Sequence, residues 1–219
     1  MSDLDHDRTL ALSYIPACSR AAVRALWQLD AALGAVLTSG REPLISQIKL
    51  AWWRDSLEKL DRERAPAEPA LLSAAEQILP RGVTGADLSG MAEGWGLLLT
   101  PDPMTREELA RYAAARGGLL FRFSALLLGA ESNPEVEAAG EGWALLDLAR
   151  HSGSEIDAEA AVAAARARPG PRRWPSRLRP LGMLAALAQR DAEEGRARWE
   201  PQGAPRRMLR MIRHRLTGR

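Results

Sequence analysis

The chain has 219 residues, of which 46% are hydrophobic, and its formal net charge is +2. This length suffices for one sizeable core, and this composition excludes a disordered chain. A single cysteine, Cys18, excludes an internal disulfide framework, and no apolar run reaches the roughly 18 residues of a membrane span. Because the acidic start is unlike a secretory signal peptide, we expect a cytoplasmic protein with no transmembrane segment, peripheral at a membrane if it contacts one.

Alanine and leucine dominate the chain and strand-forming residues are few, so we predict an all-α fold. Thr105 and Glu108 form a capping box, which predicts a helix that begins there. The segment 168–180 is rich in proline and arginine and resembles a linker. Apolar residues at helical spacing predict helices over residues 7–15, 19–37, 43–61, 70–78, 84–99, 105–129, 135–150, 154–167, 181–198 and 205–216.

Two adjacent tryptophans, Trp52 and Trp53, lie in the predicted helix 43–61 and are followed at once by Arg54 and Asp55. On a helix they point about 100° apart, so one can enter the core while the other lines an edge or a cleft. The segment Ile48-Lys49-Leu50-Ala51-Trp52-Trp53-Arg54-Asp55 resembles the "RLQWWRDA" helix of the squalene/phytoene synthase family.

Further segments resemble the same family in order and spacing, and together they cover residues 8 to 150. They are Ser13-Tyr14-Ile15-Pro16, Arg20, Ala25-Leu26-Trp27, Glu108-Leu109-Ala110-Arg111-Tyr112, Gly117-Gly118 and Leu127-Leu128-Gly129. The resemblance implies a single-domain helical bundle of the isoprenoid synthase type around a central cavity. That cavity would be bounded by the helices that contain Trp27, Trp52 and Trp53, Tyr112, and Trp143.

The chain departs from the family at both aspartate-rich motifs, which in such synthases hold the Mg²⁺ ions that bind two isoprenyl diphosphates. The first motif is expected at 34–38, where the sequence reads Gly-Ala-Val-Leu-Thr, and Asp30 lies one turn too early. In the second, Asp147 and Arg150 remain, but His151 stands near the expected aspartate. Hard cations need oxygen ligands, so we predict no metal site, no catalytic residue and no cofactor.

We therefore predict a binding or assembly factor rather than an enzyme. A smaller branch of the family also lacks the aspartates while it keeps the Trp-Arg-Asp helix, and its members act in the assembly of respiratory complex I. The resemblance to that branch implies a membrane-associated protein or a lipid as the partner. The alternative is a Mg²⁺-dependent prenyl transferase that condenses two isoprenyl diphosphates head to head with metal ligands from elsewhere in the chain.

Several residues are candidates for binding an anion or a polar head group, because arginine forks suit phosphate oxygens. In the family, Arg54 and Tyr112 resemble residues near the reacting diphosphate. The alternative is that Arg54 pairs with a neighbouring helix and that Tyr112 caps the core with its hydroxyl at the surface. The complete candidate set is Arg20, Arg24, Trp53, Arg54, Tyr112 and Arg150.

Charge is distributed unevenly, so we divide the chain into a family-like body, 1–167, and a linker with basic C-terminal helices, 168–219. From residue 166 onward, 15 arginines stand against four acidic residues, and the preceding part is acidic. The last predicted helix places Met208, Leu209, Ile212 and Leu216 on one side. Arg206, Arg207, Arg210, Arg213 and Arg215 are candidate contacts to a membrane or an acidic partner. The helix could equally pack on the acidic body, and no nucleic-acid partner is expected.

Overall fold

The computed structural model describes residues 4–39, 42–99 and 103–219, and within these ranges it contains helices and no strand. The all-α prediction is confirmed. The α-helices are α1 (His6–Ser13), α2 (Ala17–Ser39), α3 (Pro43–Lys59), α4 (Pro69–Gln77), α5 (Gly85–Gly96), α6 (Arg106–Ala113), α7 (Leu119–Leu127), α8 (Pro134–His151), α9 (Glu155–Arg166), α10 (Arg179–Glu194) and α11 (Pro205–Thr217).

Side-chain caps fix where several of these helices begin. The predicted capping box is present, because the Glu108 backbone N–H donates to Thr105 Oγ1 at 3.2 Å and the Thr105 N–H donates to Glu108 Oε2 at 2.8 Å. Asp5 caps α1 by accepting the Arg8 N–H at 2.8 Å. The helix predicted over 105–129 therefore begins where the sequence indicates.

That predicted helix is not uniform, because a π-helical turn, Ala114–Gly118, separates α6 from α7. A Cβ atom on Gly117 would lie 2.1 Å from the carbonyl oxygen of Gly140, and one on Gly140 would lie 2.2 Å from that of Gly117. Only glycine allows the π-turn and α8 to approach so closely. The π-turn and this contact fix Arg116 beside α8, in the middle of the molecule.

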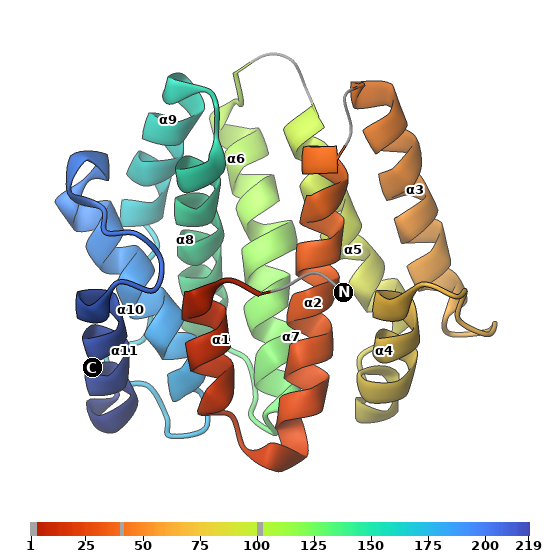
Figure 1. The fold of residues 1–219 in the computed structure, drawn as a ribbon, viewed down its shortest axis with the longest axis horizontal. Coiled ribbons are helices and arrows are strands. Elements are labelled where there is room, and N and C mark those ends of the chain that lie inside the picture. The colour runs from red at the N-terminus through yellow and green to blue at the C-terminus, as the bar shows by residue number, and fades with distance from the viewer. Residues whose placement is uncertain (1–3, 40–41, 100–102) are drawn as a thin grey trace.

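The helices form two groups about a central pair (Figure 1). The column of α6, the π-turn and α7 stands beside α8, with α3, α4 and α5 on one side and α9, α10 and α11 on the other. Helix α8 packs on the π-turn, α7, α9 and α10, while α3 packs chiefly on α5.

The C-terminal helices pack on the rest of the chain. Helix α10 contacts α8 and α9, and α11 contacts α10 and α1. The segment 168–178 contains no helix, as its prolines suggest. Trp174 within it is nevertheless buried, and the backbone N–H of Trp174 donates to the carbonyl oxygen of Gly218 at 2.9 Å. Arg207 of α11 is buried between Asp7 of α1 and Asp191 of α10, at 2.8 and 2.7 Å.

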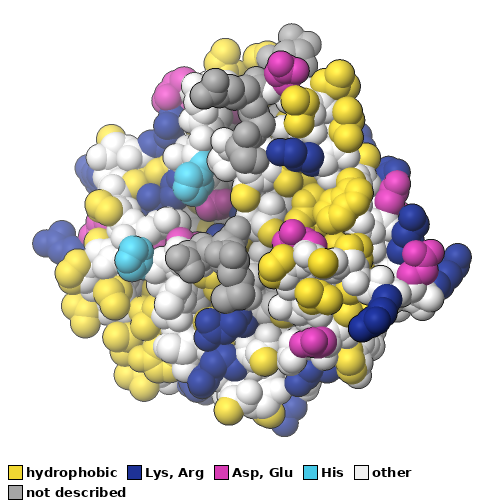
Figure 2. Space-filling view, turned by 45° about the vertical axis from the view of Figure 1, so that its right-hand side comes forward, with side chains coloured by type: hydrophobic (Ala, Val, Ile, Leu, Met, Phe, Trp, Pro, Cys, Tyr) yellow, Lys and Arg dark blue, Asp and Glu magenta, His cyan; other side chains and the backbone are white. Residues whose placement is uncertain are grey.

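The tryptophan helix α3 lies at the edge of the bundle rather than around the cavity. Trp53 is buried and Trp52 is 46% exposed, so the pair divides between core and surface as the spacing predicts. Leu44, Ile45 and Ile48 are also exposed. Figure 2 shows hydrophobic side chains gathered on the side of the molecule to which α3 belongs. The prediction that α3 bounds the cavity is wrong, because its buried face packs on α5.

None of the helices in the described ranges combines the length and the apolar character that crossing a membrane requires.

Candidate functional site

A cavity of about 790 Å³ lies between the N-terminal segment, α2, α6 and α8. This volume falls within the usual range for small-molecule sites. Residues from α5, the π-turn, α9 and the loop before α11 complete its lining. The residues that line the cavity include Asp5, Arg8, Asp30, Ala31, Gly34, Leu37, Thr38, Trp95, Leu98, Met104, Tyr112, Arg116, Asp147, His151, Ser152, Asp157 and Gln202.

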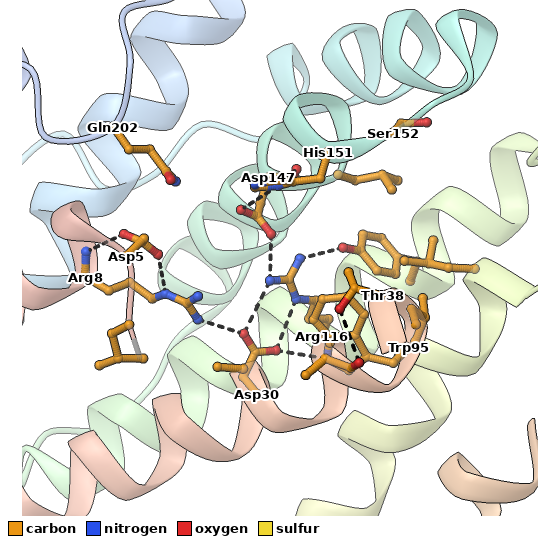
Figure 3. A pocket seen from close by; sticks show the side chains of 18 of the residues that line it. Asp5, Arg8, Asp30, Thr38, Trp95, Arg116, Asp147, His151, Ser152 and Gln202 are labelled. Atoms are coloured by element: carbon orange, nitrogen blue, oxygen red, sulfur yellow. Dashed lines mark hydrogen bonds and ion pairs between the residues drawn. The ribbon is translucent and has the colours of Figure 1, made fainter. Parts of the chain in front are cut away.

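Arg116 is the centre of the polar network at the floor of this cavity (Figure 3). Its side chain is buried and lies between two aspartates on facing helices. The guanidinium Nη2 atom is 2.7 Å from Asp147 Oδ2 on α8, and Nε donates to Asp30 Oδ1 on α2 at 3.1 Å. Its Nη1 atom donates to the Tyr112 hydroxyl at 2.6 Å. One fixed cation thus joins α2, α6 and α8.

Asp30 has both carboxylate oxygens occupied. Besides Arg116, Oδ1 accepts the Trp95 indole N–H at 3.0 Å, and Oδ2 accepts from Arg8 Nη1 at 3.1 Å. A second bond from Arg116, at 3.3 Å, also reaches Oδ2. An ionised carboxylate offers about four lone-pair positions, and here four donors take them.

Burial and these contacts set the charge states of the network. Burial alone would lower the pKa of Arg116, but Asp30, with Tyr112 and Asp147, raises it well above the ordinary arginine value. Burial would raise the pKa of Asp147, but Arg116 and His151 more than offset this and hold it well below the usual range. Burial raises the pKa of Tyr112. Arg116 is therefore charged, Asp147 is ionised and the Tyr112 hydroxyl keeps its proton at neutral pH.

The segment 34–38, where the resemblance leads us to expect the first aspartate-rich motif, lies against an aromatic ring. A Cβ atom on Gly34 would lie 2.8 Å from Cη2 of Trp95, so the indole fills the space that a side chain there would enter. The Arg116 guanidinium carbon lies 4.0 Å from the centroid of the same indole. An arginine stacked on a tryptophan thus lies beside Gly34, which belongs to the segment 34–38.

The residues present do not fit Mg²⁺, because this hard cation needs several oxygen ligands that are not already neutralised. Asp30 and Asp147 face each other across the cavity, but both are paired with Arg116. Over the described ranges, no three His, Cys, Asp or Glu side chains are grouped so that they could hold a metal ion.

His151 occupies the rim of the cavity at the end of α8. Its Nδ1 atom lies 3.4 Å from Asp147 Oδ1, and its side chain is 64% exposed. The hydrogen bond to Asp147 raises the pKa of His151, and its partial burial opposes this rise.

The structure brings only Tyr112 of the six candidate ligand residues to the central cavity. Arg20 instead donates to the carbonyl oxygen of Ile15 at the end of α1, and Arg54 pairs with its neighbour Asp55 at 3.1 Å on the surface. Arg24 is exposed on α2, and Trp53 packs beside Trp52.

Arg150 is one turn of α8 from Asp147 but does not line the central cavity. Its Nη2 atom lies 2.5 Å from Asp191, and its guanidinium stacks on Trp199 at 4.6 Å. It lines a second, smaller pocket of about 490 Å³ with Glu155 and Arg196. The six residues therefore do not form one site.

Tyr112 is the member of this network that is also a predicted site residue, whereas Arg8, Asp30, Trp95, Arg116 and Asp147 are not in that set. The sequence contains a signal for two of them. Asp30 and Arg116 are charged residues within strongly apolar helical stretches, and such residues are rarely buried without a partner. The sequence does not indicate that Asp30 pairs with Arg116, because the two residues are distant in the chain.

The basic residues of the last helix divide between two faces. Arg207 is buried in its ion pairs with Asp7 and Asp191, so it contacts an acidic part of the chain itself and is not available to a membrane. Arg206 and Arg213 are exposed, together with Leu209 and Leu216 at 66% and 72%. Arg210 and Arg215 lie between these faces, partly buried.

Comparison with known proteins identifies the family. A family model described as squalene/phytoene synthase matches residues 2–161. No curated protein and no solved structure gives a significant match. The matched region includes the cavity residues from α2, α6 and α8, and its all-α bundle around a cavity is of the isoprenoid synthase type, as the resemblance implies. The chain therefore belongs to the squalene/phytoene synthase family.

Proposed function

We propose that this chain is a non-catalytic member of its family. It binds a membrane-associated partner that resembles respiratory complex I and assists in the assembly of that partner. The observation that carries this proposal is the position of Arg116. Its buried guanidinium occupies the space between Asp30 and Asp147, the two carboxylates that face each other from α2 and α8.

A fixed guanidinium cannot replace a metal ion in the family's chemistry. Mg²⁺ binds carboxylates and diphosphate oxygens at the same time, because its remaining coordination positions are open to the substrate. The Arg116 donors are instead directed at Asp30, Asp147 and Tyr112. A diphosphate in this cavity would find neither a metal nor an unpaired guanidinium at the floor.

Two features favour a role in binding a partner. The segment Trp52-Trp53-Arg54-Asp55 is kept although the aspartate-rich motifs are lost, which is the pattern of the family's assembly-factor branch. On α3, this segment continues an exposed apolar row that includes Leu44 and Ile48. Large apolar side chains that lie exposed side by side are typical of protein contact surfaces.

Incubation of the purified protein with farnesyl and geranylgeranyl diphosphates and Mg²⁺, followed by measurement of released diphosphate, tests the proposal. We expect no release above that of a heat-inactivated control, while circular dichroism shows a folded helical protein. Turnover would refute the proposal and would establish the alternative, a prenyl transferase whose metal ligands come from elsewhere in the chain.

The outer face of α11 is the surface that we propose meets an anionic membrane from the cytoplasmic side. Arg206, Leu209, Arg213 and Leu216 are spaced by three and four residues, so they share one exposed face. Leucines that enter the head-group region beside arginines that meet lipid phosphates form a suitable interfacial surface.

Liposome flotation with Arg206→Glu and Arg213→Glu combined tests this contact. Removal of α11 is unsuitable, since the helix carries the buried Arg207. The matched control combines Arg106→Glu and Arg111→Glu, which change the charge equally at exposed positions of α6. We expect the α11 variant alone to lose binding to vesicles with phosphatidylserine. Equal binding by both variants and the unmodified protein would contradict the membrane contact.

A further inference from the structure

We infer that the central cavity takes an uncharged, mainly apolar ligand with a hydrogen-bonding head group, in place of the family's diphosphates. This inference rests on the proposed function, because it assumes that no metal ion enters the cavity.

The charged floor of the cavity is sealed from a ligand. Asp30 and Tyr112 have no exposed surface and Arg116 has 2%. Their polar atoms bond to one another, so a ligand would have to break the network to reach them. The walls that remain partly accessible are the side chains of Leu37, Leu98 and Met104, with Ala31 and the ring of Trp95 beside them. The interior therefore offers mostly apolar contacts.

The rim of the cavity disfavours an anionic head group. Asp5, Asp147 and Asp157 lie at accessible lining positions, and Arg8 is held by Asp5 and Asp30 at 2.5 and 3.1 Å. A diphosphate placed here would meet carboxylates without a metal to neutralise it. Its charge would thus oppose the attraction of its chain to the apolar walls.

A cationic head group is also poorly matched, because the rim carboxylates already have partners. Asp147 binds Arg116 and His151, and Asp157 accepts the backbone N–H of Met104 at 2.8 Å. A ligand cation would have to compete with these groups. An uncharged head can instead use the Gln202 amide, which Figure 3 shows at the rim with no bond drawn to it. The Thr38 hydroxyl, which donates to the Ala35 carbonyl at 3.2 Å, can also accept a hydrogen bond from such a head.

A matched series of ligands tests the inference, namely farnesol, farnesylamine and farnesyl diphosphate, which share one chain and differ in the charge of the head. Each would displace the uncharged fluorescent probe Nile red from the purified full-length chain. We expect farnesol to bind at least tenfold more tightly than the diphosphate, with or without Mg²⁺, and more tightly than the amine. Tighter binding of the diphosphate or the amine, or no binding of farnesol, would overturn the inference.

A pair of variants locates the binding in the cavity. Ala31→Phe places a ring in the cavity from α2, whereas Ala21→Phe adds the same ring at an exposed position of the same helix. We expect the first variant to weaken farnesol binding at least tenfold and the second to leave it unchanged, with both proteins folded. Equal affinities of the two variants would place the ligand elsewhere and overturn the inference.

The outcomes separate this inference from the proposed function. Tight binding of farnesyl diphosphate without release of diphosphate would overturn the uncharged ligand and leave the non-catalytic function intact. Release of diphosphate would refute the function itself.

Discussion

Arg116 determines the chemistry of the cavity more than any other residue. It satisfies two aspartates that face each other from α2 and α8, and its guanidinium is stacked on Trp95. Burying a charged group costs several kcal/mol unless partners compensate it, so a network of this kind is stable only when it is complete. Arg116, Asp30 and Asp147 together form an internal ion-pair cluster.

Replacement of Arg116 by methionine tests this compensation. Because Asp147 and Asp30 would then be left with too few positive partners, we expect Arg116→Met to lower the free energy of unfolding by about 3–5 kcal/mol in urea titrations. Arg111→Met, at an exposed position of α6, should change it by less than about 0.5 kcal/mol. Equal free energies of unfolding of the two variants would show that the buried ion pairs of Arg116 do not stabilise the folded protein.

His151 should give a small pH dependence at the rim. Its pKa is raised in the folded protein by Asp147, so its stabilising contribution is complete below the unfolded value of about 6.5 and is lost as the pH rises through the folded value. Since the side chain is largely exposed, we expect this contribution to the free energy of unfolding to be at most about 0.5 kcal/mol. The unfolding free energies of the unmodified protein and His151→Asn should differ more at pH 5.5 than at pH 8.5, and a difference that grows with pH would contradict this assignment.

At the scale of the elements, the π-turn between α6 and α7 and its contact with α8 position the site. The π-turn inserts one residue into a helical register, and Gly117 and Gly140 let its backbone touch that of α8. Arg116, within this π-turn, lies at 3.1 Å from Asp30 and 2.7 Å from Asp147. The position of the charge cluster thus depends on two small residues that take no part in it.

A methyl group at this contact should disturb both helices. Gly140→Ala places a Cβ atom 2.2 Å from the carbonyl oxygen of Gly117, and we expect a loss of at least about 2 kcal/mol in the free energy of unfolding. Gly96→Ala is the matched control, because a Cβ atom there meets nothing within 4 Å and alanine favours the helix. A stable Gly140→Ala protein would mean that the two backbones can separate at little cost.

The sequence predicts the elements well and their partners poorly. The helix positions follow from apolar spacing, and the capping box at Thr105 and Glu108 is confirmed. Spacing cannot show that α3 lies at the edge, since an exposed apolar row such as Leu44 and Ile48 has the same pattern as a buried one. Nor can it show that the helix over 105–129 contains a π-turn. The Asp30–Arg116 pair depends on the π-turn, which contains Arg116.

At the scale of the whole molecule, the two ends of the chain are joined. Arg207 of α11 binds Asp7 of α1, and both are buried together with Asp191 of α10. The acidic beginning and the basic end of the sequence thus neutralise each other in part. Arg206 and Arg213 remain exposed on α11, and the proposed membrane contact uses these two arginines.

His214 on the inner face of α11 should make the stability of the whole fold sensitive to acid. Burial beside Trp174 lowers its pKa to about 4, whereas the unfolded value is about 6.5. Between these values the unfolded chain binds more protons, so the free energy of unfolding falls as the pH decreases. From pH 6.5 to 4.5 we expect the unmodified protein to lose about 2 kcal/mol more than His214→Phe in urea titrations. Parallel losses in both proteins would contradict a buried neutral histidine.

In the proposed function, Arg116 takes the place of a metal ion between Asp30 and Asp147. Isothermal titration of Mg²⁺ into the protein, with and without farnesyl diphosphate, tests this claim most directly, and Asp30→Asn and Asp147→Asn identify any heat that comes from the cavity. We expect that any saturable heat of Mg²⁺ binding is the same in the unmodified protein and in both variants. Saturable Mg²⁺ binding that is lost in both variants would show that a metal ion binds between Asp30 and Asp147.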